Sequence, residues 1–127
     1  KKKNLSTLTQ GLLDSDPVMR YWSVIGLLLL EKKAKSAIPG LKNVLKDQDE
    51  IPAFAAWTIY KAGGKAFAEK WMLEAITQNP ENKTLANIFD WMGTKSHALL
   101  GKIPAEKLPQ KGLLKDVIKR SGILEEG

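Results

Sequence analysis

The sequence predicts an all-α fold, a short right-handed α-solenoid of about three helix pairs with a C-terminal capping helix. Along most of the 127 residues, apolar side chains recur at intervals of three and four, the period of an amphipathic helix. Sustained alternation with a period of two is absent and β-branched residues are sparse, so strands are not expected. The ends of the expected helices also repeat at a nearly constant interval, as they do in solenoids.

Helix boundaries are marked by capping residues. Asp16-Pro17 combines an N-cap side chain with proline at the first helical position, where its missing N–H is harmless. Gly63, Gly93 and Gly122 are suited to ending helices. These signals predict helices near 5–13, 17–31, 36–46, 50–62, 65–78, 82–92, 96–108 and 112–120.

The helix expected at 17–31 carries two adjacent apolar stripes. One consists of Val18, Trp22, Ile25 and Leu29, and the other of Tyr21, Val24 and Leu28. A helix that is apolar on two adjacent stripes is expected to lie between two layers. The predicted core is lined by Trp22, Ile25, Leu29, Ile59 and Phe89. A Leu29→Ala change would then cost roughly 2–5 kcal/mol.

The segment 27–34 recurs at 59–66 and again at 89–96. In each copy an apolar pair closes a helix: Leu27 and Leu30, Ile59 and Ala62, Phe89 and Met92. A Lys-Ala or Lys-Ser pair then opens the next helix. Upstream Val24, Ala56 and Ala86 fall in register, as do Leu41, Leu73 and Ile103 downstream. Helix pairs that repeat at intervals of about 30 residues are typical of solenoids, in which each unit packs on its neighbours.

Residues 12–27 resemble the HEAT repeat, in which a leucine pair precedes an Asp-rich turn and a Val-Arg pair opens the second helix. Leu12-Leu13 and Met19-Arg20 occupy those positions here. The second copy has Ile51-Pro52 in place of the Val-Arg pair. Because it lacks the arginine, a continuous Asp–Arg ladder between repeats is not expected.

Three features resemble more narrowly the HEAT-repeat region at the C-terminus of many bacterial sulfatases, over roughly residues 8–104. They are Arg20-Tyr21-Trp22, the 34–41 linker and the 85–93 helix. The resemblance implies an accessory domain of an exported, periplasmic or extracellular enzyme that removes sulfate esters from glycans. Calcium and formylglycine would belong to a catalytic domain outside this chain, and the expected partner is that adjoining domain or another protein.

The expected organisation is a basic N-terminal segment at 1–7, a repeat domain at 8–108, and a capping helix with a tail at 109–127. The longest apolar run is Val24–Leu30, far short of the roughly 20 residues that cross a bilayer. No membrane insertion is therefore expected. The absence of cysteine excludes disulfides and thiolate chemistry.

The net charge of +6 raises the question of nucleic acid. Half of this charge comes from Lys1–Lys3, and Arg20 and Arg120 are the only arginines. Proteins that bind phosphates or read bases rely on the two-pronged guanidinium, so nucleic acid is not the expected partner. Relatedness to the HEAT-like alkylpurine DNA glycosylases remains the alternative.

No catalytic, cofactor-binding or metal-binding residue is predicted. Segment 15–19 resembles a sulfatase nucleophile motif but has Met19 at the position of its arginine. His97 is the only histidine and cannot build a multi-histidine metal site. The acidic residues Asp14, Asp16, Asp47 and Asp49 lack the spacing of a calcium loop. Turn and cap roles are expected for them.

The four tryptophans, Trp22, Trp57, Trp71 and Trp91, are expected to pack in the core more than to stack on a ligand. Trp71 is the exception worth testing because it lies between Lys70 and Met72. The predicted interaction surface consists of Trp71, Lys70, Lys33, Lys65 and Lys95.

Overall fold

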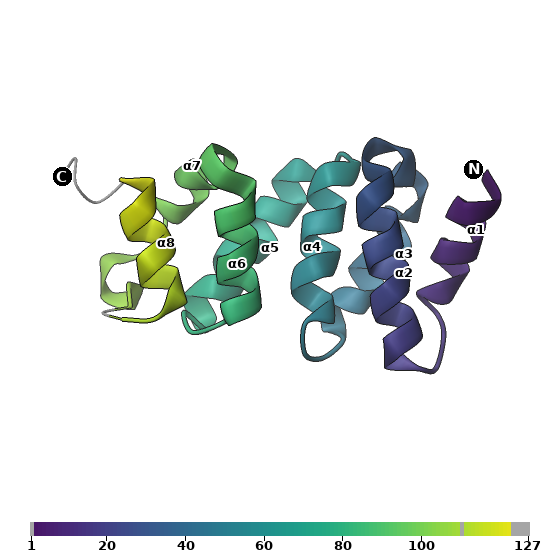
Figure 1. Ribbon diagram of the computed structural model, residues 1–127, viewed down its shortest axis with the longest axis horizontal. Helices are drawn as coiled ribbons and strands as arrows, with labels where there is room; N and C mark the ends of the chain where they lie inside the picture. Colours follow the sequence, from purple (N-terminus) through teal and green to yellow (C-terminus); the bar gives the residue numbers. More distant parts are fainter. Residues whose placement is uncertain (1, 110, 123–127) are drawn as a thin grey trace. The chain divides into compact units, whose positions relative to one another are not determined.

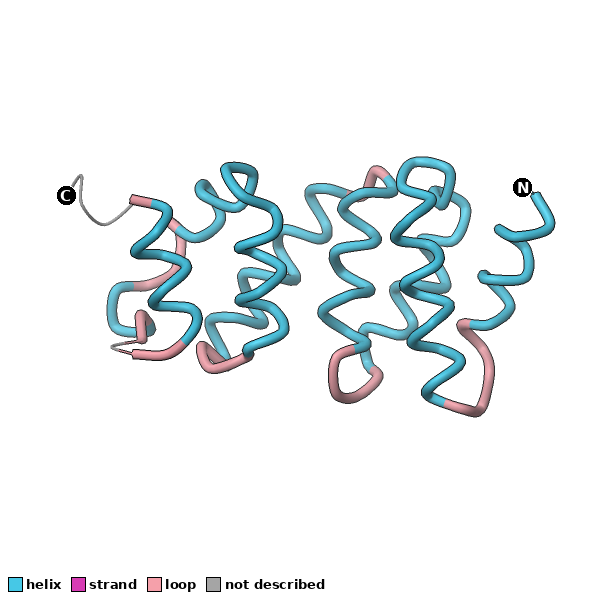
Figure 2. The backbone as a smooth tube through the Cα atoms, in the orientation of Figure 1, coloured by secondary structure: helices cyan, strands magenta, loops and turns pink. Residues whose placement is uncertain are grey.

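The computed structural model describes residues 2–109 and 111–122, and all the regular elements in these ranges are helical (Figure 2). The all-α prediction is therefore confirmed for the described residues. The chain divides into two compact units, Lys1–Ala68 and Glu69–Gly127. The predicted boundaries after residues 7 and 108 and the solenoid arrangement stay predictions. The tail expected at the C-terminal end, residues 123–127, lies outside the described ranges.

The first unit is built around two neighbouring helices. Its elements are α1 (Lys2–Gly11), α2 (Pro17–Leu30), the 3-10 segment η1 (Glu31–Ala37), α3 (Ile38–Asn43), η2 (Val44–Lys46) and α4 (Ile51–Ala62). Helix α2 packs between α1 and α4, and α3 packs against α4 (Figure 1). The chain passes into the second unit along α5 (Lys65–Gln78).

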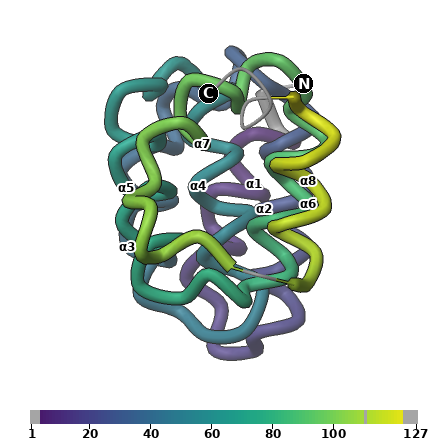
Figure 3. Tube along the Cα trace, turned by 90° about the vertical axis from the view of Figure 1, so that its left-hand side faces the viewer, coloured from purple at the N-terminus to yellow at the C-terminus, as the bar shows by residue number. Residues whose placement is uncertain are grey.

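The second unit has a similar pair of neighbouring helices. Its remaining elements are α6 (Lys83–Met92), η3 (Gly93–Ser96), α7 (His97–Leu100), η4 (Ala105–Lys107) and α8 (Leu113–Ser121). Helices α6 and α8 pack side by side, as Figures 1 and 3 show. The Asp90 carboxylate of α6 pairs with the Arg120 guanidinium of α8 at 3.2 Å.

The cap at the start of α2 is as predicted. The Asp16 carboxylate accepts a hydrogen bond of 2.9 Å from the backbone N–H of Val18, and Pro17 is the first helical residue. At α6 the cap is Asn82, whose side chain accepts from the N–H of Leu85 at 3.0 Å. In both places a side-chain oxygen satisfies an N–H that the helix leaves without a partner.

Two predicted helices are broken into shorter pieces. The range 36–46 is divided among the end of η1, α3 and η2. The range 96–108 contains only the short α7 and η4, with a break between Leu100 and Ala105. Pro104 lies in that break with an extended ψ of 139°. Proline lacks an N–H and disfavours helical backbone in the residue before it, which accounts for this interruption.

The repeated helix ends are confirmed. Helices α2, α4 and α6 end at Leu30, Ala62 and Met92. The next residue has a positive φ in every case: 52° at Glu31, 118° at Gly63 and 63° at Gly93. Equivalent positions of the three copies are also buried: Val24, Leu27, Ala56, Ile59, Ala86 and Phe89.

The assignment of core and surface on α2 was wrong for one of its two stripes. Val24 and Leu27 are fully buried, whereas Trp22 is 60% exposed and Leu29 is 77% exposed. Ile25 is half-buried. Helices α1 and α4 both contact α2, and Val24 and Leu27 belong to the buried core of this unit. No described element of this unit covers the Trp22 side. The expectation that α2 lies between two layers holds for its contacts with α1 and α4, but not for the side that carries Trp22.

The two leucines of α2 should respond very differently to truncation. We expect Leu27→Ala to lower the free energy of unfolding by roughly 2–5 kcal/mol, because the side chain is fully buried. Leu29→Ala, its control on the same helix, should change that energy by less than about 0.5 kcal/mol. Urea denaturation of the isolated chain at low protein concentration, where its surface has no partner, measures both changes. A large loss for Leu29→Ala would mean that its face is covered.

The backbone at Glu31 is better suited to glycine. Glu31 has φ 52° and ψ −123°, and Gly93 has almost the same conformation at the equivalent position, with φ 63° and ψ −134°. A residue with a side chain is strained there by roughly 1–3 kcal/mol. The Glu31–Lys61 ion pair that a substitution removes spans 3.6 Å between exposed groups and contributes little.

Glu31→Gly should therefore raise the free energy of unfolding by about 1 kcal/mol. Lys32→Gly is the matched control: this neighbour has no positive φ, so glycine there should destabilise the fold. Thermal and urea denaturation compare the two variants. Destabilisation by Glu31→Gly as large as that by Lys32→Gly would contradict the assigned strain.

Candidate functional site

The outward face of α2 carries a row of large apolar side chains, most of which are exposed to solvent. We define the α2 seam as Val18, Trp22, Ile25 and Leu29. Their intervals of four, three and four residues keep them on one side of a helix. Val18 is 57% exposed, and Trp22 and Leu29 are more exposed still. Single exposed apolar residues are ordinary on protein surfaces, but a contiguous group of them marks an interaction surface.

Aromatic rings extend this surface from α2 onto α4. Ring centroids of Trp22 and Tyr21 lie 5.1 Å apart at 77°, and those of Tyr21 and Phe54 lie 5.9 Å apart at 84°. Phe54 and Trp57 follow at 6.4 Å. We call Tyr21, Trp22, Phe54 and Trp57 the aromatic row. Trp22 is exposed and the other three rings are half-buried, so the row adds partly exposed aromatic area beside the seam.

Charged groups border the aromatic row on α4. The Lys61 ammonium lies 5.4 Å from the ring centroid of Trp57, within range of a cation–π attraction. The same ammonium is 3.6 Å from the Glu31 carboxylate at the end of α2. An apolar centre with a charged edge is the usual composition of a protein–protein interface.

Arg20 joins the two loops at the N-terminal ends of α2 and α4. Its Nε and Nη2 donate to the two Asp47 oxygens at 2.6 and 3.2 Å. Its Nη1 donates to the backbone carbonyls of Asp14 and Ser15 at 2.8 and 3.1 Å. One Asp–Arg contact between the segments before α4 and at the start of α2 is therefore present.

This contact also perturbs both ionisable groups. The hydrogen bond from Arg20 lowers the pKa of Asp47, and the N–H of Gln48 acts in the same direction against the cost of burial. The pKa of Arg20 is raised, chiefly by the same bond.

The ends of the α2 seam have opposite charge. At the N-terminal end the two joined loops expose Asp14, Asp16, Asp49 and Glu50. At the C-terminal end η1 exposes Lys32, Lys33 and Lys35. A molecule that covers the seam along its length therefore meets carboxylates at one end and ammonium groups at the other.

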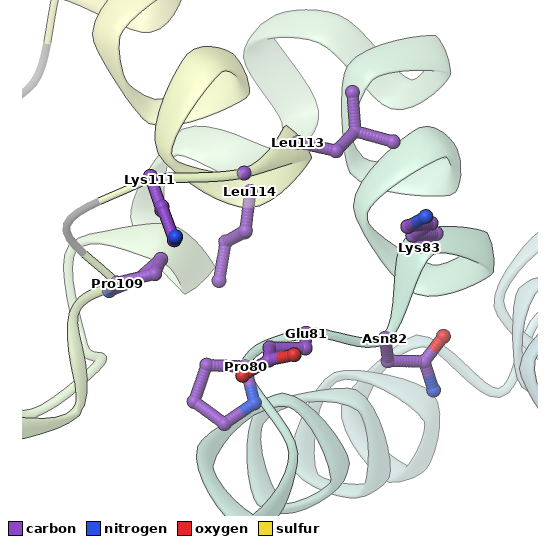
Figure 4. Close-up of a pocket in the computed structure, with 9 residues that line it drawn as sticks. Pro80, Glu81, Asn82, Lys83, Pro109, Lys111, Leu113 and Leu114 are labelled. Carbon is purple, nitrogen blue, oxygen red and sulfur yellow. The ribbon is translucent and has the colours of Figure 1, made fainter.

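The second unit contains a pocket of about 440 Å³ between the loop before α6 and the start of α8. Pro80 and Glu81 lie on that loop, and Lys111 and Leu114 extend toward it (Figure 4). The remaining lining residues are Asn82, Lys83, Pro109, Gly112 and Leu113. Glu81, Lys83 and Lys111 supply the charged groups of this lining.

The predicted interaction surface is distributed over both units. Lys33 and Lys65 belong to the first unit, and Lys70, Trp71 and Lys95 to the second. The four lysines are exposed and Trp71 is half-buried. Whether these five residues act as one surface stays a prediction.

The expectation that the tryptophans pack in the core was wrong for Trp22 and for Trp91, which is 57% exposed. Trp57 and Trp71 are half-buried. The signal for the α2 seam was present in the spacing of Val18, Trp22, Ile25 and Leu29, but the stripe was assigned to the core.

Three of the four acidic loop residues, Asp14, Asp16 and Asp47, have the turn and cap roles that were expected. The Asp14 carboxylate accepts from the N–H of Asp16 at 2.8 Å, and the Asp47 carboxylate accepts from the N–H of Gln48 at 2.8 Å. Residues 2–109 and 111–122 contain no group of three histidine, cysteine or carboxylate side chains placed to hold a metal ion. His97 is half-buried at the start of α7.

Comparisons with protein-family profiles, with curated proteins and with solved structures find no match to this chain. Within the described ranges, no helix has the length and apolar character needed to cross a membrane.

The Arg20–Asp47 contact should make stability depend on pH in acid. Because the pKa of Asp47 in the folded chain lies below its ordinary value of 3.8, the contact stabilises the fold above pH 3.8 and is lost as pH falls through the folded-state pKa. Asp47→Asn should therefore be less stable than the wild type at pH 7, with the difference shrinking below pH 3.8. Exposed Glu74→Gln is the control and should behave as wild type. Urea denaturation between pH 2 and pH 7 measures the effect, and a constant difference would contradict it.

Proposed function

We propose that this chain is a non-catalytic HEAT-like helical module that docks onto protein through the α2 seam and the aromatic row. The docking partner is the adjoining catalytic domain of a sulfatase-like hydrolase, or another protein. In this proposal the module braces its partner or shapes access to it, and the chemistry takes place elsewhere.

The exposure of Val18, Trp22 and Leu29 on one face of α2 is the observation that carries the proposal. Covering such side chains contributes roughly 1.5–3 kcal/mol each relative to leaving them in water. Tryptophan and tyrosine are also the residues most enriched among those that dominate binding energy. Trp22 and Tyr21 are already held by ring contacts, so little side-chain freedom remains to be lost on docking.

The charges beside this face favour protein over nucleic acid. Asp14, Asp16, Asp49 and Glu50 are exposed at one end of the seam and would repel a phosphate backbone. The guanidinium of Arg20 is already engaged by Asp47 and two carbonyls. Nucleic-acid binders neutralise several phosphates with cationic groups, and the seam itself presents none.

The sulfatase part of the proposal is supported by the sequence resemblance over roughly residues 8–104. The clearest of those segments are Arg20-Tyr21-Trp22 and the 85–93 helix. The resemblance places the reacting groups in a neighbouring domain and leaves this one an accessory role.

Deleting this segment from the full-length polypeptide should distinguish an accessory domain from a domain that supplies part of the active site. We expect turnover of a small aryl sulfate to be largely kept, because that substrate needs only the catalytic pocket. Thermal stability or turnover of large sulfated glycans should fall. Trp22→Ser combined with Leu29→Ser in the intact polypeptide should reproduce the effect, because both side chains belong to the docking face.

Trp91→Ser is the matched control, since this tryptophan is about as exposed as Trp22 but lies in the other unit. It should leave turnover of both substrates unchanged. Equal loss of small-substrate turnover in a folded, truncated enzyme would show that this domain supplies part of the active site. Absence of sulfatase activity in the intact polypeptide would remove the sulfatase assignment.

A further inference from the structure

The α2 seam has the spacing of a coiled-coil contact. Val18, Trp22, Ile25 and Leu29 follow one another at intervals of four, three and four residues, the alternation of the two apolar heptad positions. This interval pattern is the same when read from either end of the helix. If a second α2 lies antiparallel to the first, Val18 therefore faces Leu29 of the other copy and Trp22 faces its Ile25.

The charges at the ends of the seam fit the same arrangement. Asp14 and Asp16 precede α2, and Lys32 and Lys33 follow it. All four side chains are exposed. An antiparallel pair places the acidic end of each copy beside the basic end of the other. A parallel pair would place like charges together, which is unfavourable at an interface.

The neighbouring helix enlarges the contact. α2 has 14 residues and is about 21 Å long at 1.5 Å per residue, which is short for an interface that buries roughly 800 Å² on each partner. For the two α2 helices to pack face to face and antiparallel, the two-fold axis must lie parallel to the interface and perpendicular to α2. The same axis places α4 opposite the α4 of the other copy. Trp57 and Lys61 then lie at the edge of the buried area, beside the aromatic row.

We propose that the α2 seam binds a second copy of this chain, with the two α2 helices antiparallel across a two-fold axis. This inference rests on the proposed docking role of the same face and names its partner. The observations behind it are the exposed apolar seam, its palindromic spacing and its oppositely charged ends.

Sedimentation velocity of the 127-residue chain over a range of concentrations tests the association. The mass should rise from 14.1 kDa toward twice that value as concentration increases. Trp22→Lys should raise the dissociation constant by roughly 30-fold or more, as loss of a central interface residue does. Trp91→Lys, which changes a comparably exposed tryptophan of the other unit, should associate as the wild type does.

Cross-linking tests the orientation, because the chain has no cysteine of its own. An equimolar mixture of Val18→Cys and Leu29→Cys chains, treated with a short thiol-reactive cross-linker, should give a covalent pair. Either variant alone should give far less. Efficient pairing of each variant with itself would indicate parallel helices and overturn the arrangement.

A monomer at every concentration would overturn this inference without touching the proposed function. The two are separated by a photoreactive amino acid at position 29 of the full-length polypeptide. A cross-link from that position to its own catalytic domain or to a different protein would keep the docking role and exclude the second copy. The same photoreactive amino acid at position 91 is the control. If position 29 gives no more cross-linking than position 91, both the second copy and the docking role are contradicted.

Discussion

The bond between Arg20 and Asp47 determines how the first unit is put together. One guanidinium binds the carboxylate before α4 and the carbonyls of Asp14 and Ser15 before α2. Both loops are therefore held at the same level, and α2 and α4 begin side by side. The aromatic row, which crosses from Tyr21 to Phe54, depends on that alignment. A lysine could not replace Arg20, because an ammonium lacks the planar set of donors that reaches both loops.

The sequence was most informative about where helices begin and end. Asp16-Pro17 and the glycines at 63, 93 and 122 mark real boundaries, because caps are local interactions between near neighbours. The break around Pro104 was missed, although proline is a local signal, because the apolar periodicity was followed across it. The positive φ at Glu31 has no signal of its own in the sequence. Only the alignment of this position with Gly63 and Gly93 in the other two copies indicates it.

Which side of α2 is covered could not be predicted from the sequence. Both stripes are apolar, and the more conspicuous one, with Trp22 and Leu29, was assigned to the core. The choice depends on where α1 and α4 pack, a tertiary fact that periodicity does not contain. The proposed docking face follows from the same property, because a contiguous apolar stripe at the surface is a common feature of binding faces.

The division into two units also bears on how the chain folds during synthesis. The first unit makes the contacts of its core within residues 1–68. Helical proteins rich in local contacts fold faster than chains dominated by distant pairings. The ribosome adds roughly 5–20 residues each second. Residues 1–68 can therefore bury Val24 and Leu27 while the second unit is still being translated. The folded first unit then exposes Trp22 before synthesis of the chain ends.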